Sequence, residues 1–105
     1  IKFGTSTEKI FRNIKVDNCL IYNSMVGIGM FMKDGGLIEN CTFTNLTISN
    51  LADTAAVNPG IARQQVPIYL DVDKRLETSP LGTIRHITFD NILIDSDNGI
   101  LIQGM

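Results

Sequence analysis

An internal repeat constrains this sequence more than any other feature. Residues 11–21, 38–48 and 84–94 can be written over one another without a gap. Within each copy, apolar and polar positions alternate with the period of two that is typical of a β-strand. Columns that are apolar in every copy lie on both sides of a column that is always asparagine. Four of these apolar columns are Ile14/Cys41/Ile87, Val16/Phe43/Phe89, Cys19/Leu46/Ile92 and Ile21/Ile48/Ile94, and the asparagine column is Asn18/Asn45/Asn91.

A second strand follows each copy of the repeat. Residues 27–32, 67–72 and 99–104 align on Ile28, Ile68 and Ile100, and residues 1–4 fit the same strand of an earlier unit. The second unit is longer than the others because it carries loop insertions near 51–66 and 74–82. Asn-Pro-Gly lies in the first insertion and Thr-Ser-Pro in the second, and both are turn signals.

Short strands that recur in register predict an all-β fold, a right-handed parallel β-helix (solenoid) of about four rungs. One rung cannot bury its apolar side, whereas rungs stacked about 4.8 Å apart form continuous apolar ladders. An antiparallel sandwich is the alternative, but it gives no reason for the columns to repeat. We expect residues 1–105 to be a single β-helix segment. With no polar cap at either end, we also expect a section of a longer helix.

Composition excludes several classes of function. Hydrophobic residues make up 44% and charged residues 19% of the 105-residue chain, as in a folded soluble domain. The net charge of −2 predicts neither nucleic acid nor an anionic membrane as a partner. No apolar run is long enough to span a bilayer. We find no zinc or calcium motif, and therefore expect no metal and no cofactor.

The second strand of each unit predicts a surface suited to sugars. If Ile28 and its equivalents face the core, the outward positions include Lys2, Phe31, Tyr69, Asp71 and Asp73. An aromatic ring packs on the C–H face of a sugar, a cation pairs with a uronate, and carboxylates accept hydroxyl hydrogen bonds. Two exposed carboxylates on one strand are also compatible with an ordinary solvated surface.

Three further cations lie next to this strand. Lys33 precedes Asp34 and two glycines, a pattern that indicates a turn as readily as a binding position. Lys74 and Arg75 begin the second loop insertion, where a loop beside a groove can contact an anionic sugar.

The order of the strand motifs resembles glycoside hydrolase family 28, which contains polygalacturonases and rhamnogalacturonan hydrolases. The resemblance spans nearly the whole chain, corresponds to the later rungs of the family's β-helix, and is carried by four segments. These are Ile1-Lys-Phe-Gly-Thr5, Gly27-Ile28, Asp34-Gly-Gly-Leu-Ile-Glu-Asn40 and Pro67-Ile-Tyr-Leu-Asp71.

The resemblance implies that the chain is part of a longer enzyme that is secreted or periplasmic. The full-length enzyme is expected to be a monomer. That enzyme would hydrolyse an acidic, pectin-type plant polysaccharide or oligosaccharide with inversion. The family's catalytic Asn-Thr-Asp and Asp-Asp motifs are absent here. The segment is therefore expected to hold no catalytic residue and to be inactive alone. The substrate-binding residues predicted for it are Lys2, Phe31, Lys33, Tyr69, Asp71, Asp73, Lys74 and Arg75.

Two departures from the family pattern bear on the substrate. The family's Arg-Ile-Lys falls on residues 29–31, which read Gly-Met-Phe, and the family's tyrosine falls on Lys74. These differences argue against hydrolysis of plain polygalacturonate. They favour an enzyme that cleaves a related linkage, or an exo-acting enzyme. The alternative hypothesis is a non-catalytic β-helix of an adhesin or phage-tail type, with a structural or lectin-like role. Because fold alone does not decide function, both hypotheses depend on the outward surface.

Overall fold

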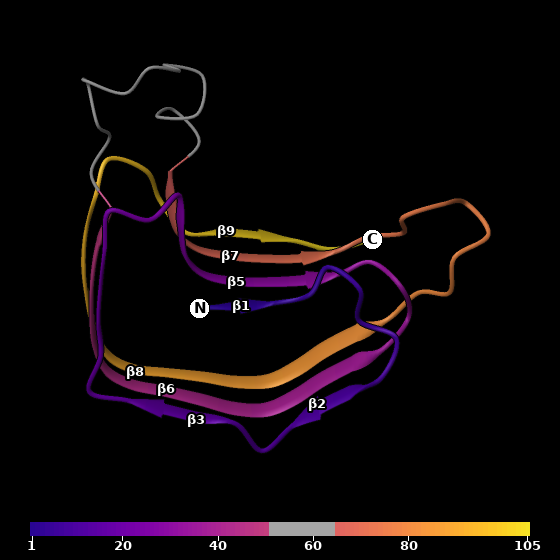
Figure 1. Cartoon of the computed structure of the whole chain (residues 1–105), viewed down its shortest axis with the longest axis horizontal. Coiled ribbons are helices and arrows are strands. Elements are labelled where there is room, and N and C mark those ends of the chain that lie inside the picture. The colour runs from indigo at the N-terminus through magenta and orange to yellow at the C-terminus, as the bar shows by residue number, and fades with distance from the viewer. Residues whose placement is uncertain (51–64) are drawn as a thin grey trace.

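The structure is a computed structural model that describes residues 1–50 and 65–105 (Figure 1). The described residues form strands and connecting turns. The strands are β1 (Lys2–Phe3), β2 (Ile10–Arg12), β3 (Lys15–Asp17), β4 (Leu20–Tyr22), β5 (Val26–Met32), β6 (Leu37–Asn50), β7 (Val66–Val72), β8 (Thr83–Ser96) and β9 (Leu101–Gln103).

These strands make two sheets. The four-stranded sheet has the order β1-β5-β7-β9. In the five-stranded sheet the long strand β6 is central, with β8 on one edge and the short strands β2, β3 and β4 along the other. Figure 1 shows the two sheets on opposite sides of the molecule, each as a stack of strands running side by side.

The repeat columns become neighbours across the five-stranded sheet. Each strand pairing in the described residues is parallel, and Val16 pairs with Phe43, which pairs with Phe89. In the four-stranded sheet, Ile28 likewise pairs with Ile68. The alignment of the repeats is therefore confirmed, because the columns read from the sequence are the columns of the sheets.

Asparagine turns the chain where the strands of the five-stranded sheet bend. Asn18, Asn45 and Asn91 have φ values of 56°, 54° and 55°, in the left-handed region that asparagine tolerates better than most residues. Asn91 Nδ2 donates to Asn45 Oδ1 at 2.7 Å, so two members of the column are also joined by a side-chain bond. His86 has a φ of 56° and occupies the same column as Asn13 and Asn40, the third position of each repeat copy.

The core lies between the two sheets and is most complete in the middle layer. Phe43 of β6 is fully buried, stacked on Phe89 with ring centroids 5.3 Å apart and in edge contact with Phe3. Ile28 and Met30 of β5 are also fully buried. A side chain therefore gains most burial where it has a layer on both sides.

An ion-pair column crosses the outer face of the five-stranded sheet. Glu39 of β6 accepts from Arg12 Nε at 2.6 Å and from Arg85 Nε at 2.7 Å. Its side chain is 7% exposed, so the two arginines satisfy a buried carboxylate from either side. The guanidinium groups of Arg85 and Arg12 hold the pKa of Glu39 below its ordinary value.

The prediction of a right-handed parallel β-helix of about four rungs is wrong. The described residues form a small, compact, strand-rich unit of two sheets, in which no solenoid is detected. One sheet is four strands deep, whereas the other has three layers around β6. Sequence columns report which residues pair, and a compact two-sheet unit satisfies the same pairings without being a solenoid.

The two loop insertions have different outcomes. Residues 51–64 of the first, expected near 51–66, lie outside the described residues. In the second, expected near 74–82, no strand forms between the end of β7 and the start of β8. A turn within it is closed by a bond from Ser79 N to Leu76 O at 2.9 Å and another from Leu76 N to Ser79 Oγ at 3.0 Å.

Candidate functional site

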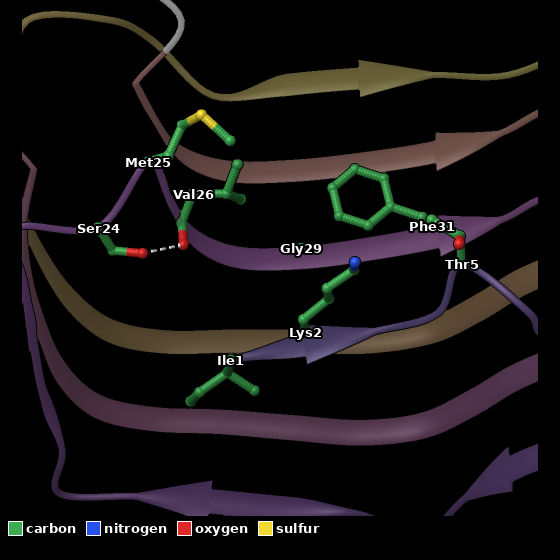
Figure 2. A pocket seen from close by; sticks show the side chains of 8 residues that line it. All are labelled: Ile1, Lys2, Thr5, Ser24, Met25, Val26, Gly29 and Phe31. Atoms are coloured by element: carbon green, nitrogen blue, oxygen red, sulfur yellow. Dashed lines mark hydrogen bonds between the residues drawn. The ribbon is translucent and has the colours of Figure 1, made fainter. Parts of the chain in front are cut away.

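Several of the predicted binding residues lie on the outer face of the four-stranded sheet. On its inner face, Phe3, Ile28 and Ile68 are buried in the core. Strand alternation therefore directs Lys2 and Tyr69 outward. In Figure 2, Lys2 and Phe31 lie on this outer face, from the neighbouring strands β1 and β5.

The missing side chain of Gly29 makes room for the ring of Phe31. A Cβ placed on Gly29 would lie 2.6 Å from Phe31 Cε2 and 3.0 Å from Phe31 Cζ. The ring thus folds back over the glycine, to a position between Lys2 and Tyr69, which both pair with Gly29. A side chain at residue 29 would occupy the space that the ring now uses.

Lys2, Phe31 and Tyr69 consequently form a line across three strands. Lys2 Nζ lies 5.8 Å from the centroid of the Phe31 ring, a cation–π distance. The rings of Phe31 and Tyr69 meet edge to face, with centroids 5.3 Å apart and an interplanar angle of 82°. The Tyr69 hydroxyl group donates to Gln103 Oε1 at 2.9 Å, which extends the contacts to β9.

Two adjoining hollows run along this line, and together we call them the groove. The first, of about 460 Å³, is lined by Ile1, Lys2, Thr5, Ser24, Met25, Val26, Gly29 and Phe31 (Figure 2). The second, of about 450 Å³, is lined by Met25, Val26, Phe31, Val66, Tyr69 and Leu101. Met25, Val26 and Phe31 line both hollows, so the two lie side by side on the face that runs from β1 to β9.

A polar cluster lies on the same outer face, beside the groove. Lys33 Nζ donates to Asp71 Oδ2 and, at 3.3 Å, to Asp73 Oδ2. The side chain of Asp71 is 9% exposed, and that of Asp73 is 49% exposed. Hydrogen bonding to Asp71 raises the pKa of Lys33 above its ordinary value. The Lys74 N–H, which donates to Asp73 Oδ1 at 2.7 Å, and Lys33 lower the pKa of Asp73.

The remaining predicted cations do not line the groove. Arg75 binds Asp34 through two nitrogens, with Nε to Oδ1 and Nη2 to Oδ2 both at 2.8 Å. This pairing lowers the pKa of Asp34 and raises that of Arg75. The backbone N–H of Lys74 donates to Asp73 Oδ1, and Lys74 is not among the residues that line the groove. Of the eight predicted residues, the groove therefore brings together Lys2, Phe31 and Tyr69.

Sequence reasoning missed the wall formed by Ser24, Met25 and Val26. These residues end the turn before β5 and begin that strand, and Ser24 Oγ donates to Val26 O at 2.7 Å. Met25 is 48% exposed, so its side chain is available to a ligand. No alternation or repeat column distinguishes these three residues, and the only signal was their place next to the aligned Gly27.

Comparisons with known proteins assign no family to this chain. No family, curated protein or solved structure matches it. Nothing in these comparisons links it to glycoside hydrolase family 28. In residues 1–50 and 65–105, no three His, Cys, Asp or Glu side chains are grouped to hold a metal ion. Over the same ranges, no helix is long and apolar enough to cross a membrane.

Proposed function

We propose that the groove binds an acidic oligosaccharide of the pectin type, as the substrate-binding part of a polysaccharide hydrolase. The observation that carries this proposal is the line of Lys2, Phe31 and Tyr69 along two adjoining, mostly apolar hollows. Aromatic surface packs on the C–H face of a sugar ring, and an ammonium group pairs with a uronate carboxylate. A concave apolar surface with a few polar groups is the usual form of a small-ligand site.

The carboxylates beside the groove support binding and not acid catalysis. Inverting hydrolysis needs one carboxylic acid that stays protonated and one carboxylate that activates water. Asp71 and Asp73 both accept from Lys33, and the lowered pKa of Asp73 keeps it ionised. We therefore assign no general acid to this face, and we expect the chain to release no reducing ends from any pectin. Measurable turnover in a reducing-end assay would contradict this assignment.

The same arrangement favours a lectin-like role as the second candidate. A face whose carboxylates are held by a lysine can recognise a sugar without cleaving it. Both candidates use the same groove, so binding is the property to measure first.

The binding test compares acidic and neutral oligosaccharides on matched variants. Isothermal titration with a short oligogalacturonate is expected to show binding that Lys2→Gln weakens about tenfold, since hydrogen bonds to a charged group contribute about 1.5–3 kcal/mol. Gly29→Ala is expected to weaken it as well, because the added Cβ displaces the Phe31 ring. Lys15→Gln, on the other sheet, is the matched control and is expected to leave binding unchanged.

Two results would contradict the proposal. One is the absence of binding by any acidic oligosaccharide in the millimolar range. The other is an equal effect of Lys2→Gln and Lys15→Gln, which would show that overall charge and not the groove is responsible. A neutral gluco-oligosaccharide, measured with the same variants, separates the contribution of the rings from that of the cation.

A further inference from the structure

We propose that β8 is a docking edge for an extended segment of another polypeptide, which adds to the five-stranded sheet as a further parallel strand. The segment has an acidic residue next to Arg85, a threonine–asparagine pair next to Asp90, and apolar residues that face the core. This interaction is independent of the groove, because β8 belongs to the other sheet.

One edge of β8 is open. Among the described residues β8 pairs with β6 and with no other strand, so it is the last strand on that side of the sheet (Figure 1). It runs for 14 residues without interruption, whereas the opposite edge of the sheet is divided into the short strands β2, β3 and β4. A long, continuous edge accepts an added strand, and short edge strands are a usual protection against one.

The apolar residues of β8 lack the cover that those of β6 receive. The inward residues of β6 have strands on both sides and are buried: Ile38, Cys41, Phe43, Leu46 and Ile48. The residues of β8 that pair with them are only partly buried: Ile84, Ile87, Phe89, Ile92 and Ile94. The last three of these line the apolar hollow of about 330 Å³, together with isoleucines of β7 and of the segment around β9. An added strand in the same register covers both the column and the hollow with its own apolar residues.

Polar contacts on the other side of β6 show which strand fits such an edge. Arg12 Nε donates to Glu39 Oε1 at 2.6 Å. Asp17 Oδ1 accepts from Thr44 Oγ1 at 2.7 Å and from Asn45 Nδ2 at 3.0 Å, and these bonds lower the pKa of Asp17. An edge with this arginine and aspartate is therefore matched by a strand that has glutamate, threonine and asparagine in the register of β6.

β8 presents the same arginine and aspartate again. Arg85 and Asp90 occupy the columns of Arg12 and Asp17. The side chain of Arg85 is 53% exposed, and its Nε bond to Glu39 uses one of several N–H donors of the guanidinium group. Asp90 is exposed. The open edge can therefore bind a carboxylate at Arg85 and accept from hydroxyl or amide donors at Asp90.

A second copy of this chain does not match the charges of the edge. The strands of the copy that would add in this register are its β2, β3 and β4. They would set Arg12 beside Arg85 and Asp17 beside Asp90. Like charges directly opposite each other on neighbouring strands are destabilising. The charges therefore favour a different polypeptide, whose segment resembles β6 at these positions.

A peptide with the sequence of β6 is the probe, because β6 already satisfies this chemistry. It comprises residues 37–50 with alanine in place of Cys41, and it carries a fluorescent label. Anisotropy titration with the full chain is expected to show saturable binding. A Glu39→Lys peptide is expected to bind about tenfold more weakly, because a charge-assisted hydrogen bond to Arg85 is replaced by a like-charge contact.

A proline peptide tests whether the segment binds as a strand. On the equivalent side of β6, the N–H of Thr42 donates to Ile14 O at 2.9 Å. The Thr42→Pro peptide keeps every charge but lacks this donor, and proline does not fit the interior of a ladder. It is therefore expected not to bind.

Two variants of the full chain locate the bound peptide. Arg85→Gln is expected to remove the preference for the glutamate peptide, so that the glutamate and lysine peptides bind equally. Arg12→Gln is the matched control, because it removes the other arginine bonded to Glu39, on the opposite edge of the sheet. It is expected to keep the preference. Each variant leaves one arginine on Glu39, so neither leaves that carboxylate unpaired.

Every other outcome overturns the inference. No saturable binding up to about 1 mM peptide would show that the edge does not accept this strand. An unchanged preference in Arg85→Gln, or a lost preference in Arg12→Gln, would place the peptide elsewhere. Equal binding of the Thr42→Pro peptide would show that no ladder forms. If sedimentation shows that the chain alone is a dimer and that the peptide displaces one copy, the edge belongs to a second copy.

Discussion

Replacing Phe43 by alanine tests whether the middle layer carries most of the stability. The Phe43 side chain is fully buried and contacts the rings of both Phe89 and Phe3. Removing a buried phenylalanine side chain costs about 3–5 kcal/mol, and each aromatic pair adds about 0.5–1.5 kcal/mol beyond area burial. We therefore expect Phe43→Ala to lower the free energy of unfolding by about 4 kcal/mol, a large share of the roughly 5–15 kcal/mol typical of a domain.

Phe89→Ala is the matched comparison, because it removes the same ring one layer away. Phe89 is partly buried and lines an apolar hollow of about 330 Å³ with Ile68, Ile92, Ile94, Ile100 and Ile102. Its ring packs on Phe43 on one side and borders this hollow on the other. We expect about 2 kcal/mol for Phe89→Ala, roughly half the effect of Phe43→Ala, since it buries less surface than a fully packed ring.

Urea unfolding followed by circular dichroism measures both variants. The urea midpoints are compared only if the dependence of the unfolding free energy on urea concentration has the same slope in each protein. The differences then report stability and not a change in the unfolded state. If Phe43→Ala leaves too little folded protein, Phe43→Leu provides a milder change in the same direction. Equal losses for Phe43→Ala and Phe89→Ala, or a loss below about 2 kcal/mol for the former, would refute the assignment of the core to the middle layer.

Two further predictions concern the turns and the ion pairs. His86→Asn is expected to raise the free energy of unfolding by about 0.5 kcal/mol, and His86→Val is expected to lower it by about 1–2 kcal/mol. The reason is that a left-handed φ suits asparagine and strains a β-branched residue. Urea midpoints in the reverse order would contradict this prediction. The lowered pKa of Glu39 means that its stabilising effect is complete above its ordinary pKa of 4.5 and is lost as the pH falls through the lowered value. The urea midpoint should therefore drop between pH 7 and pH 3, less so in Glu39→Gln, whereas identical drops in both proteins would exclude Glu39 as the cause.

The strand pairing could be predicted from sequence because pairing residues share a chemical requirement. Val16, Phe43 and Phe89 must each fill one position of a stacked apolar column, so they align without knowledge of the fold. The outward direction of Lys2 and Tyr69 follows from the same alternation. What alternation does not contain is how many layers form or how the sheets close on each other, and the fold class was wrong for that reason.

The contacts made within the site were beyond the reach of sequence. The ion pair between Lys33 and Asp71 joins the residue that follows β5 to a residue of β7, 38 positions later in the chain, and it neutralises a cation that was predicted to bind sugar. The position of the Phe31 ring depends on the empty space at Gly29, which is a property of neighbouring atoms. Alternation gives the direction of a side chain, but its rotamer and partner depend on packing.

Asparagine at the bends couples local conformation to assembly. Asn45 adopts a backbone geometry that is unfavourable for an isolated residue, and its amide oxygen accepts from Asn91 only when the next strand is already in register. Without the neighbouring strand in place, Asn45 would hold the same backbone geometry but lack the hydrogen bond from Asn91. Partly assembled states are therefore penalised at this bend, and folding of these two strands is expected to proceed as one concerted transition.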